Sequence, residues 1–490
     1  MKFKLKAIFK DISLTFITQA IILVAFFFIY RLIAKNFGPE GVGEYSLIKR
    51  VIGLLCPVLF LGLGIGVPRY IAMSRDENQK GTYIKIGGLT VAASTFIFLI
   101  FINLFKDHFA NIFFGSTNYI NLVLPFSFFL AGLILHTLIY SFFRGRLLVK
   151  TFNLLQIINL ALVPIGILIF FKNITIEKLI ILIGITTFII AFVFSLFLIK
   201  VLFIHTEKWR FKNSLKELFR YSFPRYIASF VYAGLLSLGP IFAAHFASIR
   251  EVGYLSVSQS LLGMVGAAIA PLGIILLPKV GNMIDQKRWE EIKENSDLLI
   301  GAVLQCSIFI CFQLIIFTDV IIKYWLGSEF LDAVLVMRII FLSIIFYVFY
   351  IAMRSILDAA KVKPLNTINL SVSLGVFLII GAILLLLKFF SPVISLSIAF
   401  SIGIAYLGIL TYISIGKIYF KRSKKDLNYL WVAILFNILL GSIAIFVKSF
   451  VISRFYCLIF FELLMGIIYL LILWLLKMEW IRQIPEKVFQ

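Results

Sequence analysis

Residues 42–53, VGEYSLIKRVIG, are echoed 210 positions later by residues 252–263, VGYLSVSQSLLG. Within this stretch Val, Gly, Ser and a second Gly recur at identical spacing. The same shift, applied without a gap, pairs further residues of types that are rare in an apolar chain: Pro68 with Pro278, Met73 with Met283, Arg144 with Arg354 and Asn159 with Asn369. Because the register holds through several loops, the sequence indicates an internal duplication.

The composition places this duplicated chain in a membrane. Of its 490 residues 62% are hydrophobic and 14% are charged, and the mean hydropathy is +1.06, whereas soluble domains are about half apolar and about a quarter charged. Apolar runs of roughly 18 to 25 residues, enough to cross a bilayer core of about 30 Å, recur from Ile12 to Leu476, and we expect about fourteen spans. Runs of this length exclude the alternating strands of a barrel. The sequence therefore predicts an all-α polytopic membrane protein.

The net charge of +23 indicates membrane topology rather than nucleic-acid binding. When the polar breaks are assigned alternately to two sides, most of the 46 Lys and Arg residues fall on the side of the N-terminus, including the basic segment 200–225. Positive residues stay cytoplasmic, so we expect both termini in the cytoplasm and the chain in a cell inner (cytoplasmic) membrane. A smaller part of the charge is expected to meet anionic lipid headgroups.

The duplication also predicts the domain organisation. A repeat with an even number of spans enters the membrane in its original orientation, which makes the two copies parallel repeats. We expect a six-helix N-lobe at residues 1–210, a six-helix C-lobe at 211–420, and two further helices at 421–490 that have no counterpart in the repeat. In transporters of this kind two bundles rock against each other around a site near the bilayer midplane.

The main candidate site is a polar stripe in the second span. Ser46 and Lys49 or Arg50 lie at helical spacing, and ionisable residues inside a span are costly and usually face a cavity. Two adjacent cations leave a helix in different directions, so at least one must point toward protein. A cationic cavity selects anions, above all phosphate or pyrophosphate. The second copy has Gln259 and Ser260 where the first has these cations, which predicts an asymmetric cavity with its anion site in the N-lobe and Gln259 on its wall.

Three further residues join the candidate set. Arg31 ends the first span and Arg225 opens the seventh, where each either binds the anion or snorkels to the headgroups. His136 in the fourth span is a candidate for proton coupling because histidine titrates near physiological pH, although a lone membrane histidine is more often a packing residue. The N-lobe spans are expected to lack buried acidic residues, and Asp319 is expected at a wet outer end.

Several kinds of site are not expected. The chain has no G-x-x-x-x-G-K-[ST] motif, so nothing cradles ATP phosphates. The four cysteines lie in apolar spans without a C-x-x-C pattern and are expected to be packing residues; we expect no metal, no cofactor and no enzymatic activity. The glycine-rich residues 62–68, GLGIGVP, follow no strand, so they indicate close helix packing or local unwinding rather than a dinucleotide site.

Residues 36–46, NFGPEGVGEYS, resemble the LGPEGFGLYSL signature of polysaccharide transporter proteins, the oligosaccharide flippases (Wzx-type) of the MOP superfamily. Residues 220–224 (RYSFP) and 143–146 (FRGR) are also similar to this family. The resemblance implies two six-helix lobes around a central cavity, carrying polyprenyl-pyrophosphate-linked oligosaccharide from the cytoplasmic to the outer leaflet for cell-surface polysaccharide biosynthesis. The Gly-Pro-Glu-Gly segment itself is expected to be a helix-ending turn in which Pro stops the preceding helix. We expect a monomer whose partners are this glycan, membrane lipids and glycan polymerase or assembly proteins, and no nucleic acid.

Other functions stay open at this point. A lipid II (peptidoglycan precursor) flippase would share the fold and the cationic cavity. A multidrug/cation antiporter of the same superfamily is disfavoured because cationic drugs and Na⁺ need buried carboxylates in the N-lobe. A membrane-embedded glycan polymerase or ligase usually needs a long extramembrane catalytic loop, which the chain lacks, and a structural scaffold has no need for a polar stripe in each lobe.

Overall fold

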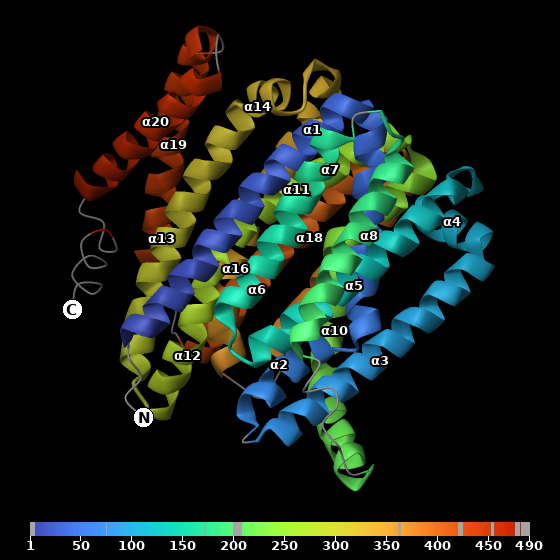
Figure 1. Ribbon diagram of the computed structural model, residues 1–490. Coiled ribbons are helices and arrows are strands. Elements are labelled where there is room, and N and C mark those ends of the chain that lie inside the picture. Colours follow the sequence, from blue (N-terminus) through green and yellow to red (C-terminus); the bar gives the residue numbers. More distant parts are fainter. Residues whose placement is uncertain are drawn as a thin grey trace. The chain divides into compact units, whose positions relative to one another are not determined.

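The computed structural model describes residues 5–74, 76–171, 173–198, 208–360, 364–419, 425–451 and 455–475, together with residue 481. Every regular element in these ranges is helical (Figure 1), which confirms the all-α fold. The chain forms two compact units, Met1–Val257 and Ser258–Gln490. The first unit thus extends beyond residue 210, where the repeat places the end of the N-lobe. The lobe boundaries 1–210, 211–420 and 421–490 follow from the duplication and stay a prediction.

The first unit is built on the longest helices of the chain. Its elements are α1 (Leu5–Phe60), α2 (Leu63–Met73), α3 (Glu77–Leu104), α4 (Lys106–Phe114), the 3-10 helix η1 (Thr117–Leu122), α5 (Val123–Gly145), α6 (Val149–Ile157), the π-helix η2 (Ile158–Leu162), α7 (Val163–Phe170), α8 (Ile176–Ser195), the 3-10 helix η3 (Leu196–Leu198), α10 (Lys208–Phe246) and the first part of α11 (Ile249–Ile269). Small residues let two of these helices approach closely, since a methyl group on Gly132 of α5 would meet the backbone of Gly184 on α8. Such contacts are typical of helix pairs in membranes.

The second unit contains the remaining helices. They are α12 (Pro271–Asp285), α13 (Trp289–Ile316), α14 (Thr318–Trp325), the 3-10 helix η4 (Ser328–Ala333), α15 (Val334–Phe341), α16 (Ile344–Ala360), α17 (Leu365–Leu387), α18 (Pro392–Tyr419), α19 (Lys425–Val451) and α20 (Phe455–Leu475). The last two helices, red in Figure 1, pack beside α13. The rings of Phe309 and Tyr469 stack 4.7 Å apart, and the Tyr469 hydroxyl donates to the Gln305 carbonyl at 3.1 Å.

An ion pair also fastens α19 to the rest of the second unit. The Lys448 ammonium lies 2.5 Å from an Asp319 carboxylate oxygen and donates to the Ile316 carbonyl at 2.8 Å. We expected Asp319 to be a wet residue at a helix end. In addition, it pairs with a lysine of another helix. The hydrophobic pattern gave no sign of this partner, which lies 129 residues away.

Eleven helical stretches among the described residues are long and apolar enough to cross a membrane, or twelve if the bent pair Ser328–Phe341 and Ile344–Ala359 counts as one span. One of the eleven, Ser13–Phe60, has 48 residues, which at about 1.5 Å per residue is more than twice the hydrocarbon thickness. A shorter apolar helix covers Ala433–Phe446. The chain is therefore a multi-pass membrane protein, and the count of fourteen spans stays a prediction.

A single glycine divides α1 into two antiparallel halves. Gly38 has φ 63° and ψ −166°, a conformation that an L-residue with a side chain rarely adopts. Lys49 lies over the ring of Phe26 and the rings of Tyr30 and Tyr45 touch, so the halves run in opposite directions. The expected turn in the Gly-Pro-Glu-Gly segment is confirmed at Gly38. Pro39 is the first residue of the second half, where a missing N–H costs nothing. Pro39 therefore helps to start the second half as well as to stop the first.

The two echoed stretches meet each other in the structure. A methyl group on Gly43 would press against the Ile249 carbonyl, and one on Gly253 would press against Gly43 and the Pro39 carbonyl. Pro39 and Ile249 are themselves 210 positions apart, so each glycine packs on the partner's equivalent residue. Reciprocal contacts of this kind are the signature of a two-fold axis. The duplication read from the sequence is thus reproduced as a symmetric packing of glycines.

The repeated asparagines do the same task in both copies. Asn159 in η2 donates to the Thr187 carbonyl of α8 at 3.3 Å, and Asn369 in α17 donates to the Ser414 hydroxyl of α18 at 3.1 Å. Each buried amide therefore joins the last two expected spans of its copy, which contain η2 and α8 in the first copy and α17 and α18 in the second. Hydrogen bonds between buried polar side chains are a common means of fixing helix pairs in membranes.

The glycine-rich segment after α1 combines a helix break with close packing. Gly62 has φ 78° and separates α1 from α2. Added methyl groups at Gly62 and Gly66 would both collide with Ser222 of α10. Both parts of the structural interpretation of this segment, local unwinding and close helix approach, are confirmed.

Candidate functional site

Lys49 lies in an aromatic cage formed by the two halves of α1. Phe26 and Tyr30 stand one turn apart on the first half, and Tyr45 stands one turn before Lys49 on the second. The ammonium lies 4.6 Å from the centre of the Phe26 ring and 5.3 Å from each of the two tyrosine rings. Ring faces attract a cation, with about 2 kcal/mol or more available in a desolvated setting. The cage therefore holds this half-buried charge at a fixed place in the membrane helix.

The caged ammonium keeps its capacity to bind an anion. Within the described part of the chain it forms no hydrogen bond and no ion pair. Ring faces take up none of the three N–H groups in a conventional hydrogen bond. A phosphate oxygen is the kind of acceptor that such a point charge binds. The Ser46 hydroxyl, one turn away, is directed to the Tyr30 hydroxyl at 3.5 Å, so a second polar group lies beside the cage.

The Arg50 side chain does not join the cage of Lys49 and binds backbone carbonyl groups of two other helices. Its guanidinium donates to the carbonyl of Leu236 in α10 at 3.1 Å and to that of Ser256 in α11 at 2.8 Å. The carbonyl of Leu236 needs this donor because the residue four positions on, Pro240, has no N–H. The prediction that at least one of the two cations points toward protein is confirmed, and both do so. Arg50 therefore acts as a clamp between helices, a role that its sequence position did not reveal.

Arg225 belongs to a second cationic cluster. Its guanidinium carbon lies 3.7 Å from the centre of the Tyr221 ring, and that of Arg69 lies 4.2 Å from the same centre. Both arginines are exposed, and neither has a carboxylate partner among the described residues. Two guanidinium groups on one ring can bind an anion from two sides. Arg69 closes the second expected span, a position that did not by itself indicate a site, and no sequence pattern marked Tyr221, although Tyr221 lies within residues 220–224 (RYSFP).

The other two candidate cavity residues, Arg31 and Gln259, have different surroundings. Arg31 is exposed on the first half of α1, and its side chain leaves the helix about 100° around from that of its neighbour Tyr30. Gln259 lies in the second unit and is 1% exposed. Neither atom of the Gln259 amide has a hydrogen-bond partner within the described residues. An unpaired buried amide costs about 1 to 3 kcal/mol, so Gln259 is a group that a ligand or another conformation would satisfy.

His136 is built into the packing of the first unit. It is 4% exposed, and the Asn159 amide nitrogen lies 3.1 Å from its Nδ1 atom. Since the same amide nitrogen also donates to the Thr187 carbonyl, the histidine ring accepts at Nδ1. The contacts favour a packing role, and proton coupling stays a prediction.

One acidic residue departs from the expected pattern. Glu44 is half-buried within the apolar stretch Ser13–Phe60, whereas we expected no buried carboxylate in the spans of the N-lobe. Glu44 follows the Gly38 break on the second half of α1. Glu177, which accepts a hydrogen bond from Asn121 at 2.8 Å, is close enough to act on its charge. Other carboxylates of the first unit lie nearer Arg69 and Arg225, since Glu217 of α10 accepts from the Tyr83 hydroxyl at 3.1 Å.

Comparison with known proteins identifies the fold. No sequence profile of a known family matches the chain, and no curated protein matches its sequence. A lipid II flippase, MurJ in an inward closed conformation, is 18% identical with a TM-score of 0.72, over 95% of this chain and 97% of that one. An inward-facing multidrug resistance transporter of the MATE family, MOP superfamily, is 14% identical with a TM-score of 0.67, over 82% and 94%. A MATE transporter of Vibrio cholerae is 15% identical with a TM-score of 0.58, over 83% and 96%.

The chain has the MOP-type fold. The likeness extends over nearly the whole length of each compared protein. This confirms the fold class. At identities below one fifth it concerns the fold, and function has to be argued from the side chains of this chain.

Proposed function

We propose that the protein is a flippase that moves a polyprenyl-pyrophosphate-linked oligosaccharide from the cytoplasmic to the outer leaflet by alternating access. The observation that carries the proposal is Lys49, a half-buried cation in a membrane helix that three rings position and that no carboxylate of the described residues neutralises. An uncompensated charge at this depth is costly unless it serves a ligand. A pyrophosphate has the charge and the oxygen acceptors to satisfy it.

The cluster of Arg69, Tyr221 and Arg225 supports the same cargo. It offers two further guanidinium groups without carboxylate partners in the described part of the first unit. If both termini are cytoplasmic, as the charge pattern predicts, this cluster lies on the cytoplasmic side, where the lipid-linked precursor would enter. Lys49 then lies deeper, along the path toward the other leaflet. The two clusters would thus provide one cationic binding site where the anion enters and a second one within the membrane.

A lipid II flippase is the second candidate. The fold likeness to the lipid II flippase MurJ covers 95% of this chain. Lipid II also presents a polyprenyl pyrophosphate to the protein, so the same cations would bind it. A cation antiporter is favoured less, because the candidate site presents the cation Lys49, which forms no ion pair with a carboxylate of the described residues.

Reconstitution tests the proposal directly. Purified protein in liposomes should translocate a fluorescent polyprenyl-pyrophosphate glycan, and Lys49→Gln should reduce the initial rate at least tenfold. Lys178→Gln is a matched control, since Lys178 is exposed at the start of α8 and outside both clusters. A rate that is unchanged in a folded Lys49→Gln variant would contradict the site. Rescue of cells depleted of their lipid II flippase would favour the second candidate over the first.

A further inference from the structure

A pocket outside both cationic clusters lies where three helices of the first unit end or begin. Its cavity volume is about 410 Å³, and it is lined by the end of α5, the start of α6 and the last turns of α8 with η3. Pockets that hold small ligands have volumes of about 300 to 1,000 Å³. The cavity is thus large enough for the phosphoglycerol part of a lipid.

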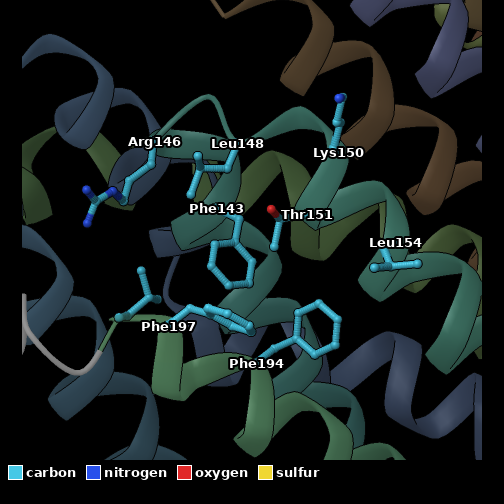
Figure 2. Close-up of a pocket in the computed structure, with 9 residues that line it drawn as sticks. Phe143, Arg146, Leu148, Lys150, Thr151, Leu154, Phe194 and Phe197 are labelled. Carbon is cyan, nitrogen blue, oxygen red and sulfur yellow. The ribbon is translucent and has the colours of Figure 1, made fainter.

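The pocket has one apolar wall and one polar wall. The rings of Phe143, Phe194 and Phe197 gather on one side, the Thr151 side chain lies beside Phe143, and Lys150 extends from the rim away from the rings (Figure 2). Phe197 is 73% exposed, although it lies at the end of an apolar stretch long enough to cross the membrane, Ile176–Leu198. An exposed ring at such a place faces lipid rather than water. The apolar wall is therefore continuous with the hydrocarbon of the bilayer.

The polar wall carries positive charge. The Arg146 guanidinium pairs with Glu77 at 3.1 Å, and the same carboxylate group also holds Lys80 at 2.9 Å. Lys150 is exposed and has no carboxylate partner among the described residues. Its neighbour Thr151 adds a hydroxyl, and the first-turn amides of α6 have no side-chain cap. An anionic headgroup complements this wall, whereas a zwitterionic one brings a second positive charge to it.

We propose that this pocket binds an anionic phospholipid of the surrounding membrane, with the phosphate at Lys150 and Thr151 and the acyl chains along Phe194, Phe197 and Leu154. The site is separate from the transport path formed by Lys49 and the Tyr221 cluster, and it does not depend on the identity of the transported molecule. Basic pockets between membrane helices on the cytoplasmic side are known to recognise lipid headgroups. The proposal assigns such a role to residues 143–154 and 194–198.

Native mass spectrometry of the detergent-purified protein tests this site. Titration with phosphatidylglycerol should show one lipid retained more tightly than phosphatidylcholine. Lys150→Gln should weaken the retained lipid about fivefold, the fold-change that corresponds to about 1 kcal/mol for one lysine at a membrane surface. Lys178→Gln, the same substitution at the opposite end of α8, should leave the titration unchanged. Thr151→Phe should abolish the tight binding by filling the pocket, and Lys150→Gln, at an exposed position, keeps the test valid if that variant does not fold.

The contrary outcomes are equally definite. Equal retention of phosphatidylglycerol and phosphatidylcholine would overturn the proposal, because it would show annular lipid only. Equal loss in Lys150→Gln and Lys178→Gln would overturn it as well. Displacement by inorganic phosphate alone, or preference for polyprenyl phosphate over phosphatidylglycerol, would assign the pocket to another ligand. Each result is independent of the transport assay, so failure here leaves the proposed function untouched.

Discussion

The second half of α1 and the start of α11 are two copies of one stretch, and they share packing residues but not charges. Gly43 and Gly253 make the same reciprocal contact. Six or seven positions further on, Lys49 and Arg50 stand where the second copy has Gln259 and Ser260. Backbone packing thus kept its symmetry, because a glycine contact requires both sides to be small. The polar positions were free to diverge, and in the first copy one of them became a caged cation and the other a clamp.

The largest effect is expected at the shared glycine. Gly43→Ala places a methyl group against the Ile249 carbonyl, and overpacking against rigid backbone costs about 3 kcal/mol, the upper end of the usual range. Gly263→Ala is the matched control, since nothing lies within 4 Å of the added methyl group and alanine is the better helix former by about 1 kcal/mol. Thermal unfolding in detergent should therefore show Gly43→Ala clearly below and Gly263→Ala at or above the parent. Equal melting temperatures would contradict the claim that the reciprocal contact requires glycine at position 43.

The next effect concerns the arginine that the second copy lacks. Arg50→Ala leaves the Leu236 carbonyl without a donor, which costs about 1 to 3 kcal/mol. Pro240→Ala restores an N–H four residues after Leu236, so Arg50→Ala should cost about 1 kcal/mol less in that background. A double-mutant cycle of unfolding free energies measures this coupling. Strictly additive effects would show that the clamp does not serve the proline-freed carbonyl.

Replacing Lys49 by glutamine, the residue of the second copy at this position, should affect transport far more than stability. Lys49→Gln removes the cation–π attraction, worth about 2 kcal/mol for a desolvated cation, while the aromatic rings keep packing on one another. Stability should fall by no more than that amount, whereas transport of the labelled glycan should fall at least tenfold. Comparison of unfolding midpoint and transport rate in one preparation separates the two. A loss of stability that fully accounts for the loss of transport would assign Lys49 a structural role.

The smallest effect is expected where both copies do the same work. Asn159→Leu and Asn369→Leu each remove an interhelical hydrogen bond, for which about 0.6 kcal/mol is typical in membranes. Unfolding free energies of the two variants should agree within the error of the measurement. A much larger cost at Asn159, which also contacts His136 at 3.1 Å, would indicate that the histidine pair carries a role absent from the second copy.

The sequence by itself determined the membrane, the helical fold and the duplication. Span-length apolar runs and a constant shift of 210 residues are patterns of position along the chain, so they need no knowledge of contacts. The turn at Gly38 was also predictable, because backbone freedom is a local property of glycine. The candidate Lys49 followed from the cost of a charge inside a span.

Only the tertiary structure decided what each charge does. Arg50 and Lys49 are neighbours in sequence, yet one binds carbonyls 186 and 206 residues away while the other lies among rings of its own helical hairpin. Arg69 and Arg225 became a pair only through the ring of Tyr221, and the pocket beside Thr151 lies where the ends of α5 and α8 meet the start of α6. Partners so distant along the chain leave no periodic signal, because hydrophobic patterning reports which side of a helix is apolar and not which helix faces it.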